Sequence, residues 1–143
     1  MNSTTPTAAP VRRRGLNVTL WVVQVLLAGM FLMSGLMKLS QPIDALASSL
    51  PWTTSVPALL VRFIGAAEFA GALGLLIPSL TRIKPRLTVL AALGLVLVML
   101  LASGFHVTRG EYAMLPMNLV LGALAAFVAW GRAKAAPIAP RAA

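Results

Sequence analysis

The chain has 143 residues, of which 59% are hydrophobic and only 10% are charged, and its mean hydropathy is +0.88. Soluble domains carry about 25% charged residues, so this composition indicates an integral membrane protein. The absence of cysteine excludes thiol–disulfide chemistry, iron–sulfur clusters and thiolate-bound metals in this polypeptide. A single histidine also excludes a haem held by two histidines of one chain.

Four apolar segments are each close to the roughly 20 residues that a helix needs to cross about 30 Å of hydrocarbon. They predict membrane spans at 16–37, 57–77, 87–105 and 113–130. Four spans consume most of the chain and leave no room for a second domain. The sequence therefore predicts an all-α fold, a four-transmembrane-helix bundle formed by residues 16–132.

A polar N-terminal tail (residues 1–15) and a Pro/Ala-rich C-terminal tail (residues 133–143) flank this bundle, and we expect both to be disordered and cytoplasmic. The arginines at 12–14 resemble the start of a secretory or twin-arginine signal. However, the apolar core after them is longer than the roughly 7 to 15 residues of a signal peptide, and no soluble domain follows for export. We therefore interpret the first span as a retained signal anchor.

The loop after the first span has a helical pattern of its own. Ile43, Leu46 and Leu50 repeat at intervals of three and four residues before Pro51 stops the pattern, which predicts a short interfacial helix in the first outer loop. With Trp52 beside it, this helix could cover the outer mouth of the bundle as a lid. An idle helix on the membrane surface fits the same pattern.

The net charge of +9 is distributed unevenly between the two sides of the membrane. If the four spans alternate in direction, nine basic residues share one side, and only Lys38, Arg62 and Arg109 belong to the other half. By the positive-inside rule, both termini then face the cytoplasm, most simply in a bacterial cytoplasmic membrane. The basic excess orients the protein and contacts anionic lipid, so we do not expect nucleic acid as a partner. The nine residues are Arg12, Arg13, Arg14, Arg82, Lys84, Arg86, Arg132, Lys134 and Arg141.

Glu68 lies near the middle of the second predicted span. A charge at this depth costs several kcal/mol unless it is paired, hydrated or protonated, and such residues usually face the bundle interior or a cavity. Glu68 shares a helical face with the small residues Gly65, Gly71 and Ala72, which allow a neighbouring backbone to approach closely. We therefore expect Glu68 to face protein and to serve as a proton acceptor or counter-ion.

Four further polar residues lie at related depths. Lys38 closes the first span and His106 the third, whereas Arg62 and Asn118 each lie roughly 8 Å in from the outer end of their span. This one-sided distribution predicts a vestibule that opens outward. We expect Lys38 and His106 to act with Glu68 as catalytic residues, and Asn118 and Arg62 to bind a ligand or cofactor. Arg62 is off the Glu68 face, so its side chain could instead reach the lipid headgroups.

Each of these residues also has a purely structural interpretation. Glu68 and Lys38 could form an interhelical ion pair without any chemistry, and Lys38 could simply anchor the end of its span. His106 could bond a loop carbonyl, and Asn118 could join two helices. The seven methionines fit ordinary packing, and no residue pattern predicts a metal site.

The polar and small residues together resemble the DoxX-like family of small four-helix membrane proteins, over about residues 20–132. The most specific part is the run from Gly65 to Pro78, in which a buried glutamate is set among small residues. The matching pattern reads Ser34-Gly35-x-x-Lys38-Leu39, Arg62-x-Ile64-Gly65-x-x-Glu68-x-x-Gly71-Ala72-x-Gly74-Leu75-x-x-Pro78, Ala92-x-Gly94, His106 and Asn118.

This family takes its name from a membrane subunit associated with a thiosulfate:quinone oxidoreductase. The resemblance therefore implies proximity to quinone or respiratory redox chemistry, at Lys38, Glu68, His106 and Asn118. On this interpretation, the chain binds a small amphipathic or quinone-like molecule in the outer half of the bundle. A bound cofactor or a partner oxidoreductase subunit would supply the electrons, since no side chain here is a redox centre.

Two alternatives from other functional classes stay open. A proton-coupled small-molecule transporter would exchange protons for substrate at Glu68; small multidrug exporters also have four helices and one buried glutamate, but theirs lies in the first span. A non-catalytic membrane anchor would dock a soluble oxidoreductase and would not need Glu68. The small-residue faces fit a monomer and a homodimer alike.

Overall fold

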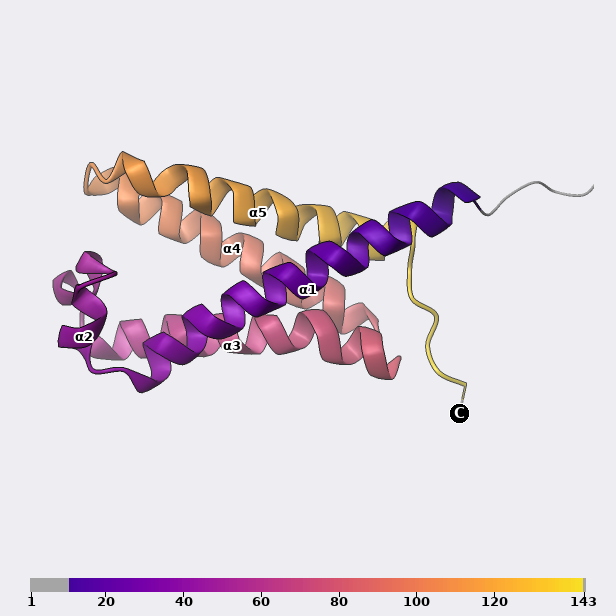
Figure 1. Ribbon diagram of the computed structural model, residues 1–143, viewed down its shortest axis with the longest axis horizontal. Helices are drawn as coiled ribbons and strands as arrows, with labels where there is room; N and C mark the ends of the chain where they lie inside the picture. The colour runs from indigo at the N-terminus through magenta and orange to yellow at the C-terminus, as the bar shows by residue number, and fades with distance from the viewer. Residues whose placement is uncertain (1–10, 143) are drawn as a thin grey trace, which may run out of the picture.

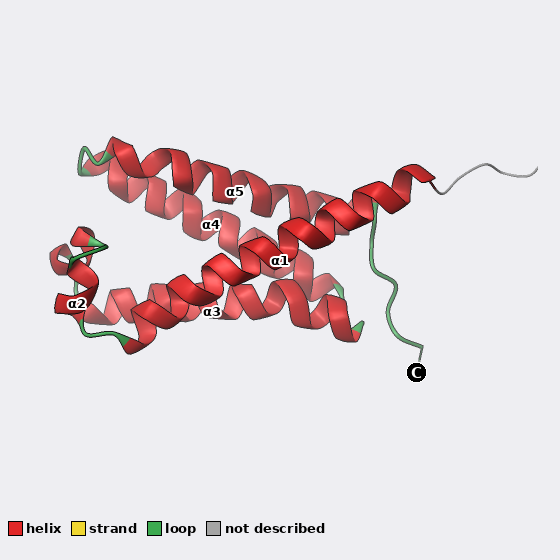
Figure 2. Ribbon diagram, in the orientation of Figure 1, coloured by secondary structure: helices red, strands yellow, loops and turns green. Residues whose placement is uncertain are grey.

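The computed structural model describes residues 11–142, and helices account for most of them (Figure 2). Four helical segments are long and apolar enough to cross a membrane, the fourth of them being Tyr112–Ala135, which includes α5 and the helical turns on both sides of it. No strand forms within the described residues. The predicted all-helical fold with four spans is therefore confirmed. The four helices are α1 (Val11–Ser40), α3 (Ala58–Thr81), α4 (Arg86–Thr108) and α5 (Leu115–Trp130).

Short helical elements connect or extend these four helices. The connection from α1 to α3 contains α2 (Ile43–Ala47) and the 3-10 turn η1 (Pro51–Ser55), which confirms the predicted short helix in the first loop. Trp52 of η1 packs edge-on against Phe105 near the end of α4, with ring centroids 6.0 Å apart. The first loop is thereby attached to the far helix pair. The remaining elements are η2 (Tyr112–Met114) and the π-helical turn η3 (Gly131–Ala135).

The bundle consists of two helix pairs. In Figure 1, α1 lies along α3 and α4 lies along α5, and α3 joins the pairs by packing against α4. We call the end with α2 and the α4–α5 connection the loop end, and the opposite end the tail end. At the tail end, α1 packs against α5 and η3, and Leu20 of α1 lies against Gly131 of η3. Toward the loop end, α1 diverges from α5 (Figure 1).

Small and branched apolar side chains fill the space between the helices. Phe31, Leu75, Leu95 and Val128, one from each long helix, are at most 2% exposed. Many other large apolar side chains, such as Leu59 at 80% exposed, instead point outward. An apolar surface of this extent is expected where lipid, rather than water, surrounds the helices.

α1, α3 and α4 continue past the ends of the spans expected at 16–37, 57–77 and 87–105, and helical structure reaches into both flanking segments. Residues 1–10 lie outside the described residues, but 11–15 already belong to α1. At the other terminus, 131–135 form η3, and the following segment folds back against the end of α3. There Arg82 Nε donates to the carbonyl oxygen of Ala139 at 3.1 Å, and the Arg141 amide donates to the Arg82 carbonyl at 2.9 Å. These hydrogen bonds give the segment a defined path.

Candidate functional site

The site begins with a close approach of the α1 and α3 backbones. A Cβ atom placed on Gly35 would lie 2.7 Å from the carbonyl oxygen of Gly65, and one placed on Gly65 would lie 2.7 Å from Lys38 Cβ. Side chains of any size would clash at these distances. Because both positions are glycine, the two helices come close enough for Lys38 of α1 to reach Glu68, one turn along α3.

Lys38 and Glu68 form an ion pair in which both carboxylate oxygens take part. Lys38 Nζ lies 2.9 Å from Glu68 Oε1 and 2.7 Å from Oε2. Ser34, one turn before Lys38, donates its hydroxyl to Glu68 Oε2 at 2.9 Å and accepts a hydrogen bond from Lys38 Nζ at 2.6 Å. The three side chains form a closed ring of hydrogen bonds between α1 and α3.

This ion pair is buried at the loop end. Lys38 is 5% exposed and Glu68 is 4% exposed. Isolated charges at this depth would be strongly unfavourable, but each charge here faces its opposite at hydrogen-bond distance. Arg62 adds a further link, because its Nη1 donates to the carbonyl oxygen of Lys38. Arg62 thus binds the end of α1 through the backbone and does not join the carboxylate.

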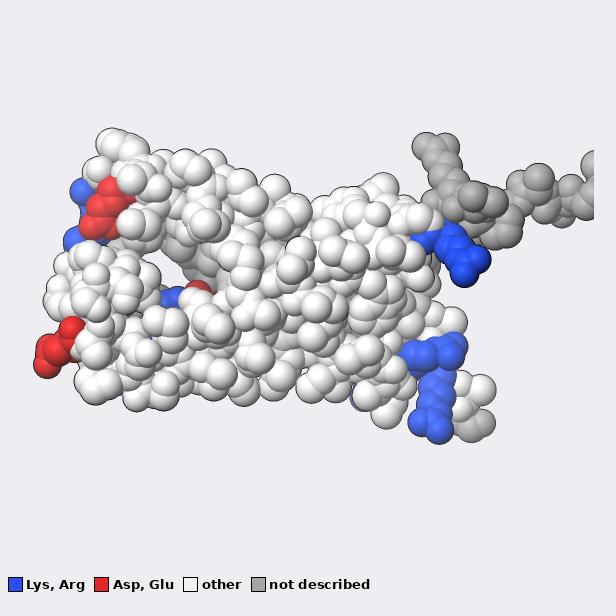
Figure 3. Space-filling model, viewed as in Figure 1, with Lys and Arg blue, Asp and Glu red and all other residues white. Residues whose placement is uncertain are grey.

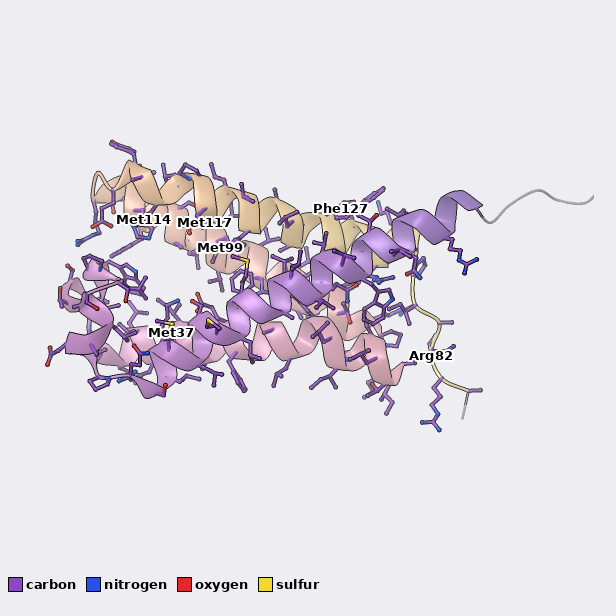
Figure 4. The ribbon with its side chains drawn as sticks, viewed as in Figure 1. Met37, Arg82, Met99, Met114, Met117 and Phe127 are labelled. Carbon is purple, nitrogen blue, oxygen red and sulfur yellow. The ribbon has the colours of Figure 1, made fainter. Side chains whose placement is uncertain are left out.

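A cavity of about 420 Å³ opens beside the ion pair. Ser34 belongs both to its wall and to the hydrogen-bond ring around Glu68. Figure 3 shows the surface hollowed near the loop end, with acidic and basic atoms visible at its depth. In Figure 4, Met37 of α1 and Met99 of α4 lie on facing sides of the space between the two helix pairs. The cavity is lined by Gly29, Met30, Met33, Ser34, Met37, Ser49 and Leu50.

His106 belongs to a second polar cluster, formed with residues of the α4–α5 connection. His106 Nδ1 lies 2.7 Å from Glu111 Oε2, and Arg109 Nε donates to Glu111 Oε1 at 2.8 Å. The hydrogen bond with His106 and the charge of Arg109 hold the pKa of Glu111 below its ordinary value of 4.5, against an opposing effect of burial. The structure therefore pairs His106 with Glu111 and not with Glu68, and a shared role with Glu68 stays a prediction.

Asn118 occupies the first turns of α5 and is partly buried. Its Nδ2 atom is buried without a hydrogen-bond partner among the described residues. A buried amide donor usually finds a partner, so Asn118 retains bonding capacity that no described residue uses. The predicted ligand-binding role of Asn118 is compatible with this spare donor but is not tested by it.

The tail end contains a polar network that the sequence pattern does not predict, because every predicted site residue lies in the other half of the bundle. Gln24 is completely buried, and its Nε2 donates to the Leu75 carbonyl at 2.7 Å and to Ser79 Oγ at 3.4 Å. Ser79 Oγ also shares a hydrogen bond with Thr88 Oγ1 at 2.7 Å. The network joins α1, α3 and α4 in one set of contacts.

Arg132 of η3 completes this network. It is 4% exposed, although the charge pattern suggested only a basic residue at the membrane surface. Its Nε donates to Gln24 Oε1 and its Nη1 to Asn17 Oδ1, both at 2.5 Å. The guanidinium also lies 5.1 Å from the centroid of the Trp21 ring. A side chain from every long helix, or from its continuation, thus closes the tail end.

The two ends of the bundle therefore differ in what they can do chemically. The loop end has an ion pair behind one hydroxyl at the wall of an apolar cavity, whereas the tail end has a closed polar network. Within residues 11–142, no group of three His, Asp or Glu side chains could hold a metal ion. The loop-end arrangement suits an uncharged ligand with an apolar body and a few polar atoms.

Comparison with known sequences agrees with this fold. Residues 22–128 match the sequence model of the DoxX-like family, which is most of the chain. No curated protein and no solved structure matches the chain. The matched region includes Ser34, Lys38 and Glu68 as well as the cavity beside them.

Proposed function

This chain belongs to the DoxX-like family of membrane proteins, and from that premise we propose that it binds a small amphipathic, quinone-like molecule in the loop-end cavity. The bound molecule serves membrane redox chemistry, and its electrons pass to or from a partner oxidoreductase subunit. The observation that carries this proposal is the position of Ser34, which lines the cavity and hydrogen-bonds Glu68. A ligand in the cavity is therefore one hydroxyl away from a buried ion pair.

The cavity has the size and composition that such a ligand needs. Its volume of about 420 Å³ lies within the roughly 300–1,000 Å³ of small-molecule sites. Met30 and Met33 are 48% and 67% exposed, so this wall continues onto the lipid-facing surface of α1. An amphipathic molecule could enter from the bilayer with its tail along these thioethers. Its polar head would then point toward Ser34.

The residues present fit a quinone in particular. A quinone head carries two carbonyl oxygens that accept hydrogen bonds. The Ser34 hydroxyl lies at the cavity wall and could donate to one of them by exchanging its hydrogen bond with Glu68 for one with the ligand, while Lys38 lies behind it. When bound, a quinone supplies two-electron redox chemistry that no side chain of this protein can supply. Glu68 holds the Lys38 charge in place and is the nearest carboxylate that could accept a proton.

The closed tail end favours ligand binding over transport. A transported substrate must pass both ends of the bundle, and at the tail end Gln24 and Arg132 join the helices through buried hydrogen bonds. At the loop end, Ser49 and Leu50 of the segment between α2 and η1 line the cavity, and Trp52 of η1 contacts Phe105 of α4. We propose that this segment acts as a lid over the ligand site.

The charge distribution supports a definite orientation in the membrane. Most exposed basic residues of the described chain lie at the tail end, whereas Arg109 lies at the loop end (Figure 3), and such an excess is what the positive-inside rule expects of a cytoplasmic side. We propose that the protein lies in a bacterial cytoplasmic membrane with its tail end in the cytoplasm. The ligand cavity then lies in the outer half of the bilayer.

A cavity-filling substitution tests the proposal without touching the ion pair. Gly29 lines the cavity, and a Cβ placed there meets no atom within 4 Å. We expect Gly29→Leu to reduce binding of a short-chain quinone by about tenfold or more while the protein remains folded. Gly94→Leu is the matched control, since Gly94 also has open space around its Cβ but does not line the cavity.

Native mass spectrometry of the purified protein, with and without added short-chain quinone, measures this binding. The Glu68→Gln variant, measured beside Gly29→Leu, separates the role of the ion pair from that of the cavity. Loss of binding in both variants but not in Gly94→Leu supports the proposal. Equal binding in all four proteins would show that Glu68 and Lys38 have only a structural role.

A further inference from the structure

A second cavity, of about 750 Å³, lies at the tail end beside the start of α1. The charged and polar side chains in its wall include Arg14, Asn17 and Arg82, with Trp21 as the aromatic member. Residues 135–139 of the C-terminal segment form another wall. In Figure 4, Arg82 extends from the end of α3 beside that segment. The proposed function does not use this cavity.

All the charged side chains that line this cavity are positive. The whole chain contains three acidic residues. Glu68 is paired with Lys38, Glu111 belongs to the α4–α5 connection, and Asp44 belongs to α2, so all three lie toward the loop end. No side-chain carboxylate is therefore left to balance the arginines of the tail end.

Arg132 makes this imbalance costly because it is buried directly behind the cavity wall. Its guanidinium contacts Asn17 and Trp21, which both line the cavity. All the partners of Arg132 are neutral oxygens, and its Nη2 atom is buried with no partner among the described residues. A buried cation without a counter-charge is strongly unfavourable, so an anion nearby would stabilise the folded protein.

We propose that the tail-end cavity binds a phosphate group, with Arg14 and Arg82 contacting the phosphate. Arg132 lies behind Asn17 of the cavity wall and stabilises the phosphate by its positive charge, without direct contact. Arginine suits this role because its planar guanidinium matches the oxygens of a phosphate. Basic pockets between the cytoplasmic ends of membrane helices hold anionic lipid headgroups in this way. Trp21 lies where an interfacial aromatic side chain would flank such a headgroup.

The C-terminal segment gives the cavity its second side. Arg82 holds Ala139 through its side chain and Arg141 through its carbonyl oxygen, and Arg132 Nη1 donates to the carbonyl of Ala136 at 3.2 Å. The segment therefore lies between two of the arginines that the phosphate would contact or neighbour. Binding at this site would fasten the C-terminal segment to the bundle.

The experiment compares lipids that differ in charge. The full chain is purified in detergent, and bound lipid is counted by native mass spectrometry during titration with phosphatidylglycerol or with phosphatidylcholine. We expect phosphatidylglycerol to bind about tenfold more tightly or better, because each arginine near the headgroup contributes about 1 kcal/mol to the attraction. The Arg14→Gln/Arg82→Gln double variant should lose that preference.

The matched control removes the same charge from the same end. Arg86 and Lys134 are exposed and do not line the cavity, so the Arg86→Gln/Lys134→Gln variant should bind phosphatidylglycerol within about twofold of the unaltered protein. Arg132 is left intact in both variants because it holds the helices together. Thermal unfolding of each variant verifies that the fold survives.

Three outcomes are informative. Selective loss in the cavity variant supports a lipid phosphate site. Displacement of phosphatidylglycerol by millimolar inorganic phosphate, with direct phosphate binding lost in the cavity variant, supports the site but assigns it to a soluble phosphate. Equal loss in both double variants, or no preference between the two lipids, would overturn the proposal in favour of diffuse surface attraction.

Discussion

Gly35 and Gly65 face each other across the α1–α3 contact at a separation that no side chain could occupy. A Cβ on Gly35 would lie 2.7 Å from the Gly65 carbonyl oxygen and 2.8 Å from the Phe69 amide nitrogen. Both obstacles are backbone atoms, which cannot rotate away. The ion pair between Lys38 and Glu68 lies within about one turn of this contact and depends on the same helix separation.

We predict that Gly35→Ala destabilises the protein by about 1–3 kcal/mol, as overpacking of a tight contact does. The added methyl group must push α1 and α3 apart, so the variant should also weaken the bond between Lys38 and Glu68. The free energy of unfolding, measured by denaturation in mixed micelles, tests the first part. Quinone binding by the same variant tests the second.

Gly104→Ala is the control for this prediction. A Cβ on Gly104 meets no atom within 4 Å, so the change should be neutral or should stabilise α4 by up to about 1 kcal/mol. A Gly35→Ala protein as stable as the Gly104→Ala protein would contradict the close contact.

We predict that the effects of substituting Lys38 and Glu68 on the free energy of unfolding are coupled. Glu68→Gln alone leaves a buried ammonium, and Lys38→Met alone leaves a buried carboxylate, so each should cost about 3–5 kcal/mol. The Lys38→Met/Glu68→Gln protein has neither charge and should be more stable than the sum of the single effects predicts. A double-mutant cycle of unfolding free energies measures this difference.

Simple addition of the two single effects in that cycle would argue against a direct pair. The cycle also separates structure from function. We expect the double variant to recover stability but not quinone binding, because the charges that bond the cavity residue Ser34 are gone. Recovery of both would leave Lys38 and Glu68 with a structural role alone.

The helical pattern of α1 shows how much of the site could be predicted. Positions 17, 24, 31 and 38 recur every seven residues and fall on one face of a helix. Lys38 at the end of that row and its possible pairing with Glu68 are predictable, because both are charges in or near apolar spans. Asn17 and Gln24 lie on the same face but are neutral, so a search for charges in apolar spans does not identify them. The seven-residue spacing was the signal that could have found them.

Other parts of the site depend on contacts that a span pattern does not encode. Arg132 lies two residues after Trp130, the end of the predicted fourth span, where basic residues usually face water. In the fold it is buried and bonds Gln24 and Asn17 of α1, a contact that the span pattern does not encode. The pairing of His106 with Glu111 depends on the turn between α4 and α5. The position of these residues in their spans predicts that both ends of that turn lie at the membrane surface. It does not predict which side chains form hydrogen bonds with each other.

The cluster around Glu111 should make stability depend on pH. Its pKa is held below 4.5, chiefly by the hydrogen bond with His106, so folding favours the carboxylate form. The stabilisation is therefore fully present above pH 4.5 and is lost as the pH falls through the lowered pKa. We predict that Glu111→Gln lowers the unfolding temperature at neutral pH, and that the difference from the unaltered protein shrinks below pH 4.5.

Asp44→Asn is the control, because it removes one negative charge from the loop end without removing an ion pair within the described residues. Unfolding temperatures of the unaltered protein, Glu111→Gln and Asp44→Asn are measured between pH 3 and pH 8. The lower limit lies about one and a half pH units below the ordinary pKa of a glutamate side chain. A Glu111→Gln difference that stays constant across this range would contradict the proposed contribution of the carboxylate.

The network at the tail end predicts a stability effect far from the ligand cavity. Gln24→Leu removes the partner of Arg132 Nε and of the Leu75 carbonyl, both buried. We expect a loss of about 1–3 kcal/mol in unfolding free energy with quinone binding unchanged. Thr19→Val, which removes a hydrogen bond within α1 alone, should have a smaller effect. Equal effects would show that the network does not hold the helices together.

The orientation in the membrane can be measured cleanly because the chain has no cysteine. Ser49 at the loop end and Ala133 at the tail end are both exposed, so each can be replaced singly by cysteine. If the basic tail end faces the cytoplasm, a membrane-impermeant maleimide should label Ser49→Cys in intact cells and should label Ala133→Cys only after the cells are opened. The opposite pattern would place the ligand cavity in the cytoplasmic half of the bilayer, where a partner oxidoreductase would have to approach from the inside.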